Sequence, residues 1–134
     1  MKKLLLFLLC GFISVQSIAQ LSNSQIMKIK EDAEDGKTLW LKLLEDSYNQ
    51  KNMSELPALR KANEDFLNEH ISKLSRMYAE GDGRELIVAV KNYLTIEKQF
   101  VKDVMIPAES MKPGDEEAYD QINREIADFT RKER

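Results

Sequence analysis

Apolar residues recur every three or four positions along most of the chain after residue 20, and this spacing predicts amphipathic α-helices. Four such segments are separated by turn signals, and no segment alternates between apolar and polar residues as a half-buried strand would. The helices are expected at about residues 22–49, 55–79, 83–106 and 115–130. Because the connections are short, the pattern predicts an all-α fold, an antiparallel up-down-up-down four-helix bundle.

Residues at the ends of these segments define the predicted boundaries. Ser22 and Gln25 form an S-x-x-Q capping box at the start of the first helix. Gly81-Asp82-Gly83 is a tight connection, so the second and third helices should be antiparallel neighbours. Pro107 is expected to stop or kink the third helix. Gly36 lies on the apolar stripe of the first helix, where it either allows a close approach of another helix or breaks the helix.

Residues 1–19 have a different pattern, which is typical of a secretory signal peptide. Met1-Lys2-Lys3 is a short basic start, and a nearly unbroken apolar run follows from Leu4 to Ile13. Ser17-Ile18-Ala19 then places small residues at the −3 and −1 positions before Gln20. The apolar run is shorter than the roughly 20 residues that cross a bilayer.

These features predict an exported protein, periplasmic or secreted, that is cleaved between Ala19 and Gln20. The mature chain, residues 20–134, should form a single domain with no transmembrane segment. Two alternatives remain open: an uncleaved membrane anchor, or a lipoprotein that is lipidated on Cys10.

The composition excludes several classes of protein. The chain has 134 residues with 20 Lys and Arg against 23 Asp and Glu, and its net charge of −3 excludes a generally basic nucleic-acid-binding protein. The one cysteine, Cys10, lies in the expected signal peptide, and there is one histidine. A disulfide framework and a zinc site built from several Cys and His residues are therefore excluded.

Polar residues near the centre of apolar faces indicate a candidate binding site. Glu97 lies near the middle of the apolar arc of the third helix, where a carboxylate must be paired, hydrogen-bonded or protonated. On the second helix, His70 and Asn63 lie near the centre of the apolar face. On the first helix, Lys37 borders the apolar stripe and Trp40 brings an N–H donor. This buried polar cluster either fixes the register of the helices or binds a small molecule or a metal.

Catalysis, a metal and a cofactor are not expected. The mature chain has no Cys nucleophile, and neither G-x-S-x-G nor a phosphate-binding Gly loop is present. Leu67 stands three residues before His70, so the Glu-x-x-His pairs of bundle dimetal sites are missing. Covalent haem attachment would need Cys-x-x-Cys-His. A non-covalent haem ligated by His70 and a methionine is the alternative. The candidate methionines are Met27, Met53, Met77, Met105 and Met111.

The leading functional hypothesis is an exported, non-enzymatic interaction protein that presents a helical surface to a protein partner or to a second copy of itself. A bundle that binds a ligand through Glu97, His70 and Asn63 is the first alternative. The second comes from Leu21-Ser22-Asn23-Ser24-Gln25, which resembles the Leu-Thr-x-x-Gln signature of the Spy-like periplasmic chaperones, with Ser in place of Thr. That resemblance covers five residues and implies a holdase that binds unfolded clients.

Overall fold

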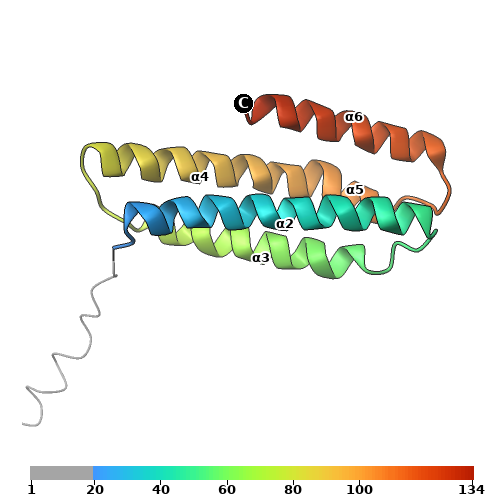
Figure 1. Cartoon of the computed structure of the whole chain (residues 1–134), viewed down its shortest axis with the longest axis horizontal. Coiled ribbons are helices and arrows are strands. Elements are labelled where there is room, and N and C mark those ends of the chain that lie inside the picture. Colours follow the sequence, from blue (N-terminus) through green and yellow to red (C-terminus); the bar gives the residue numbers. More distant parts are fainter. Residues whose placement is uncertain (1–19) are drawn as a thin grey trace, which may run out of the picture.

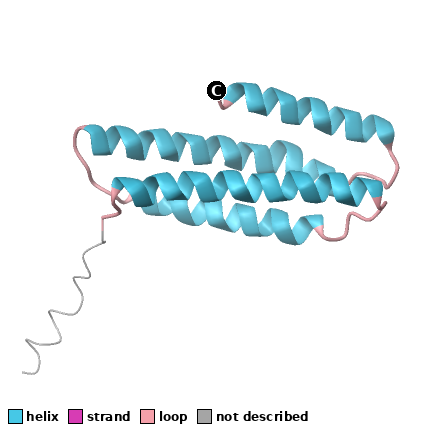
Figure 2. Ribbon diagram, viewed as in Figure 1, coloured by secondary structure: helices cyan, strands magenta, loops and turns pink. Residues whose placement is uncertain are grey.

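The computed structural model describes residues 20–134, so the expected signal peptide, residues 1–19, lies outside the described residues. The described chain folds as four long helices and contains no strand (Figure 2), which confirms the all-α prediction. The long helices are α2 (Asn23–Asn49), α3 (Leu56–Ser75), α4 (Asp82–Phe100) and α6 (Glu116–Lys132). A π-helical segment, Val101–Met105, and the short helix α5, Ile106–Glu109, extend the end of α4.

Three of the long helices pack against one another, and α6 joins them from one side. In Figure 1 the chain runs from left to right along α2 and α4, and from right to left along α3 and α6. Helices α2, α3 and α4 contact each other along their lengths. Helix α6 contacts chiefly the π-helical segment and α5. The bundle is therefore tightest among its first three helices.

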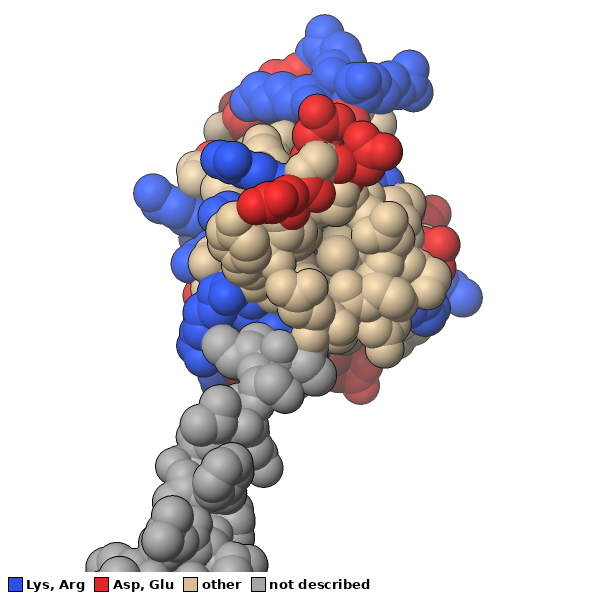
Figure 3. All heavy atoms as spheres, turned by 90° about the vertical axis from the view of Figure 1, so that its left-hand side faces the viewer, with Lys and Arg blue, Asp and Glu red and all other residues tan. Residues whose placement is uncertain are grey.

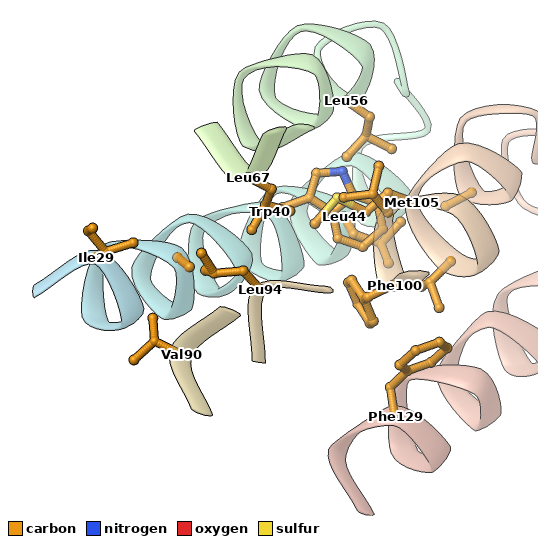
Figure 4. Packing of buried hydrophobic residues seen from close by; sticks show 14 of the residues in the cluster. Ile29, Trp40, Leu44, Leu56, Leu67, Val90, Leu94, Phe100, Met105 and Phe129 are labelled. Carbon is orange, nitrogen blue, oxygen red and sulfur yellow. The ribbon is translucent and has the colours of Figure 1, made fainter. Parts of the chain in front are cut away.

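The core is a continuous cluster of apolar side chains with aromatic rings at its centre. Figure 4 shows Trp40 of α2 between residues of the other helices, and its side chain is fully buried. The Trp40 and Phe100 rings meet edge to face with centroids 6.1 Å apart, and Phe100 meets Phe129 of α6 in the same way at 5.5 Å. Edge-to-face pairs of this kind are favourable beyond the area they bury. Aromatic contacts thus connect α6 to the core.

The start and the middle of α2 follow the sequence pattern. The capping box is present: Ser22 accepts a hydrogen bond from the backbone N–H of Gln25, and the Gln25 side chain accepts one from Ser22. The helix continues without a break through Gly36. A Cβ at Gly36 would collide with Oδ1 of Asn63 in α3, so the glycine serves the close approach of two helices rather than a kink.

Two helix ends differ from the predicted ones. Helix α3 ends at Ser75, before the expected Ala79, because the following residues already turn towards α4 while Met77 and Ala79 still pack on the core. Pro107 neither stops the third helix nor separates it from α5. The N–H of Ile106 bonds to the carbonyl of Val101, a π-type hydrogen bond that widens the turn just before the proline. This wider turn carries the helical path on to Glu109.

Candidate functional site

A lysine links three helices in the interior of the bundle. Lys37 Nζ of α2 lies 2.6 Å from Glu97 Oε1 of α4 and 2.6 Å from Oε1 of Glu133, which caps the end of α6. We call these three side chains the Lys37 cluster. Their exposed side-chain fractions are 14% for Lys37, 3% for Glu97 and 16% for Glu133. Glu97 is thus buried, as its place on the apolar arc predicts, and its carboxylate is paired with Lys37.

Burial dominates the electrostatics of the Lys37 cluster. The pKa of Glu97 is raised to about 7, chiefly because the carboxyl is removed from water; neighbouring Glu133 also raises this pKa, and Lys37 opposes the change. Burial alone would lower the pKa of Lys37, but hydrogen bonds to Glu133 and Glu97 leave that pKa above its usual value. Lys37 is therefore charged at neutral pH, and Glu97 exchanges its proton in that range.

Asn63 lies beside the Lys37 cluster, as the sequence predicted. Its Nδ2 donates a hydrogen bond to the backbone carbonyl of Gly36 at 3.2 Å. Asn63, Lys37 and Glu97 share the wall of a cavity of about 10 Å³, together with apolar residues of α2, α3 and the π-helical segment. This volume is about that of one water molecule and far below that of a ligand pocket.

His70 and Trp40 do not belong to the polar cluster. His70 Nδ1 lies 2.9 Å from the backbone oxygen of Phe66, one turn earlier in α3, and its ring stacks on the Phe66 ring at 4.1 Å. Trp40 is a core residue, and its indole N–H has no hydrogen-bond partner among the described residues. Of the five predicted site residues, the structure brings together Glu97, Lys37 and Asn63.

Glu133 is not among the predicted site residues, although the spacing of apolar residues in the last helix indicates its position. Ile122, Ile126, Phe129 and Glu133 follow a 4-3-4 spacing, so the carboxylate extends the apolar face of the last helix. This is the same reasoning that located Glu97. The predicted helix ended at residue 130 and so left Glu133 out. In the structure the helix extends to Lys132, and Glu133 is its C-cap residue.

A second feature is an open groove where α3 ends and α4 begins. It has a volume of about 590 Å³ and is lined mainly by apolar side chains, with Tyr78 71% exposed and Val88 46% exposed. Arg84, Lys91 and Glu80 are its charged lining residues. Figure 3 shows this end of the bundle as a broad uncharged area with charged side chains around it.

Gln20, the first residue that the structure describes, lies at this groove. The Gln20 side-chain amide donates a hydrogen bond to the backbone carbonyl of Tyr78. None of the groove's charged lining residues is buried, and among the described residues no cluster of metal-ligating groups lies there. We name it the α3–α4 groove.

Comparisons of the chain with protein-family models, curated proteins and solved structures found no match in any of the three. Within residues 20–134, no group of three or more His, Cys, Asp or Glu side chains is placed to hold a metal ion. In the same range, none of the helices combines the length and the apolar character that crossing a membrane requires.

Proposed function

We propose that this chain is an exported, non-enzymatic helical-bundle protein that acts through protein–protein interaction, and that its binding surface is the α3–α4 groove. The observation that carries the proposal is the exposure of Tyr78 and Val88 on an open apolar groove of about 590 Å³. Exposed apolar patches rimmed by polar residues are typical of interaction sites. Tyrosine is moreover enriched at the energetic centres of protein interfaces.

The groove suits an apolar side chain of a partner better than a charged one. Leu74 and Ile87 form buried parts of its wall, and Met77 lies beside them half-buried. Its basic residues, Arg84 and Lys91, are accompanied by Glu80, so no strong field of one sign surrounds it. The partner segment should therefore bring an aromatic or aliphatic anchor, with polar contacts at the rim.

Export and topology belong to the same proposal. The basic start, apolar run and small residues before Gln20 support cleavage after Ala19 and a periplasmic or secreted mature protein. The alternating direction of the four long helices in Figure 1 supports an antiparallel up-down-up-down bundle. In that arrangement the start of the mature chain and the groove lie at the same end of the molecule.

A ligand-binding bundle has less support than an interaction protein. The cavity next to Glu97 and Lys37 has room for about one water molecule, and His70 is bound to its own helix. A holdase of the Spy-like kind is the second candidate, because the same exposed apolar groove could contact the apolar segments of unfolded clients. The two hypotheses differ in the number of partners: the interaction protein binds one, whereas a holdase binds many.

The test places a photo-crosslinking amino acid at Tyr78 of the full-length chain in an exporting cell. The matched control places it at Leu39, which is 59% exposed but lies on α2 and does not line the groove. We expect one dominant adduct from position 78 and none from position 39; an adduct of twice the chain mass would identify a homodimer. Many adducts of unrelated mass would support the holdase. Equal crosslinking at both positions contradicts an interaction site in the groove.

A further inference from the structure

The C-terminal end of α6 is held by two contacts of different chemical kinds. Phe129 packs edge to face on Phe100, with ring centroids 5.5 Å apart. Glu133, one turn later, accepts a hydrogen bond from Lys37 at 2.6 Å. Only Ile122 and Phe129 are buried in α6, so this helix has a smaller apolar attachment than α2 or α4. The ionic contact is therefore a substantial part of what keeps the end of α6 in place.

The charge of the Lys37 cluster depends on one proton. When Glu97 is protonated, Lys37 and Glu133 form a neutral pair. When Glu97 is ionised, two carboxylates share one ammonium group, and a net negative charge lies where Glu97 is 2% exposed. Two like charges in one site disfavour each other. Glu133 is the carboxylate that can leave, because it is more exposed and stands at the end of the last helix.

We infer that the Lys37 cluster is a proton-operated latch: the end of α6 is closed on the bundle while Glu97 carries a proton and opens when that proton is lost. Burial of Glu97, whose pKa lies at about 7, places the change near neutral pH. Departure of Glu133 removes one of the causes that raise this pKa, so the open form holds the Glu97 proton less tightly. Opening thus releases a proton, and the ratio of open to closed molecules increases with pH.

The other ionisable groups around the cluster do not compete for this role. From α2, Lys30 and Glu34 pair with each other at 2.6 Å. From α4, burial raises the pKa of Tyr93 above its usual range, which keeps the phenol neutral. From α6, Lys132 lies over the Phe129 ring at 4.7 Å. The α3 and π-helical residues of the cavity wall are uncharged.

The test measures the position of α6 directly. The chain from Gln20 to Arg134 contains no cysteine, so a pair introduced at two exposed positions, Thr38 on α2 and Thr130 on α6, accepts a donor and an acceptor dye. Energy transfer is recorded between pH 5 and pH 8 with dyes that do not titrate. We expect the ratio of open to closed molecules to rise by up to about tenfold, which is the limit that a pKa difference of about one unit between the two forms sets. The rise should level off above about pH 7.

Matched variants separate the latch from general effects of pH. Glu97→Gln should remain closed throughout this range, whereas Glu109→Gln, which alters another paired carboxylate, should keep the wild-type response. If Glu97→Gln does not fold, as judged by circular dichroism, Glu133→Gln removes the second negative charge and should also abolish the response. Unchanged energy transfer in the wild type, or a wild-type response in the folded Gln variants of the cluster, would overturn the latch.

Discussion

Two ion clusters with the same number of charges lie in different parts of this bundle. In the Lys37 cluster one ammonium group lies between Glu97 and Glu133. In the second cluster Arg60 of α3 contacts Glu109 of α5 at 2.7 Å and Glu64 of its own helix at 2.8 Å. Each cluster has one cation and two carboxylates at nearly equal distances. Counting ion pairs would therefore rank the two as equals.

Their difference lies in their exposure to solvent. The most buried carboxylate of the Arg60 cluster, Glu109, has a side chain 16% exposed, against 3% for Glu97. Three guanidinium nitrogens of Arg60 share the bonds to Glu109 and Glu64, whereas Glu97 and Glu133 both depend on a single ammonium group. Desolvation can cancel the Coulomb attraction of a buried pair, although removing one partner then leaves an uncompensated charge. Burial is also the largest cause of the raised pKa of Glu97, so we expect a pH response from the Lys37 cluster.

The largest expected effect comes from removing each cation in turn. Lys37→Met leaves Glu97 buried without a partner and should lower the free energy of unfolding by about 3 kcal/mol at pH 8. At pH 5 the loss should be smaller, because Glu97 is then protonated. Arg60→Met should cost about 1 kcal/mol at both pH values. Urea unfolding of the two variants measures this difference, and equal losses would show that burial does not distinguish the clusters.

The next effect is the pH dependence of stability in the wild-type chain. Glu97 has a pKa of about 7 when folded, above the 4.5 of an unperturbed glutamate, so between these values the folded state binds more protons than the unfolded state. Stability must then fall as the pH rises through this window, by roughly 3 kcal/mol, and stay level above it. Glu97→Gln should remove the decline and Glu109→Gln should retain it. A decline that persists in Glu97→Gln would assign it to another group.

The smallest expected effect comes from the close contact between Gly36 of α2 and Asn63 of α3, next to the Lys37 cluster. In Gly36→Ala the new Cβ displaces the Asn63 side chain and breaks its hydrogen bond to the Gly36 carbonyl. We expect a loss of about 1 kcal/mol, even though Ala favours a helix more than Gly does. In an Asn63→Ala background the same change should stabilise the protein. Thermal unfolding of the four chains completes this cycle, and a stabilising Gly36→Ala in the native background would refute the contact.

Much of the fold follows from local rules that the sequence states directly. Periodicity places the four long helices, and the Ser22–Gln25 capping box fixes the start of α2. The position of Glu97 on its helix predicts its burial, because a side chain in the middle of an apolar arc has no path to water. These features depend on residues within a few turns of one another.

The remaining features depend on partners that are distant in the sequence. Lys37 and Glu133 are separated by 96 positions, and no local pattern pairs them. His70 shares the apolar face with Asn63, yet it bonds to the carbonyl of Phe66, because a nearby acceptor in its own helix costs less entropy than a partner across the bundle. The π-type turn before Pro107 likewise depends on packing, since the proline alone predicts a break.

The sequence by itself determined the helical elements, their apolar faces and the presence of an unpaired carboxylate that needed a partner. Only the tertiary structure decided which cation satisfies it, that Glu133 shares that cation, and that the end of α3 leaves an open groove at Tyr78 and Val88. The physical reason is the distance along the chain over which each interaction acts. Helix propensity and amphipathicity act over a few residues, whereas desolvation and charge pairing depend on every side chain that packing brings within a few ångströms.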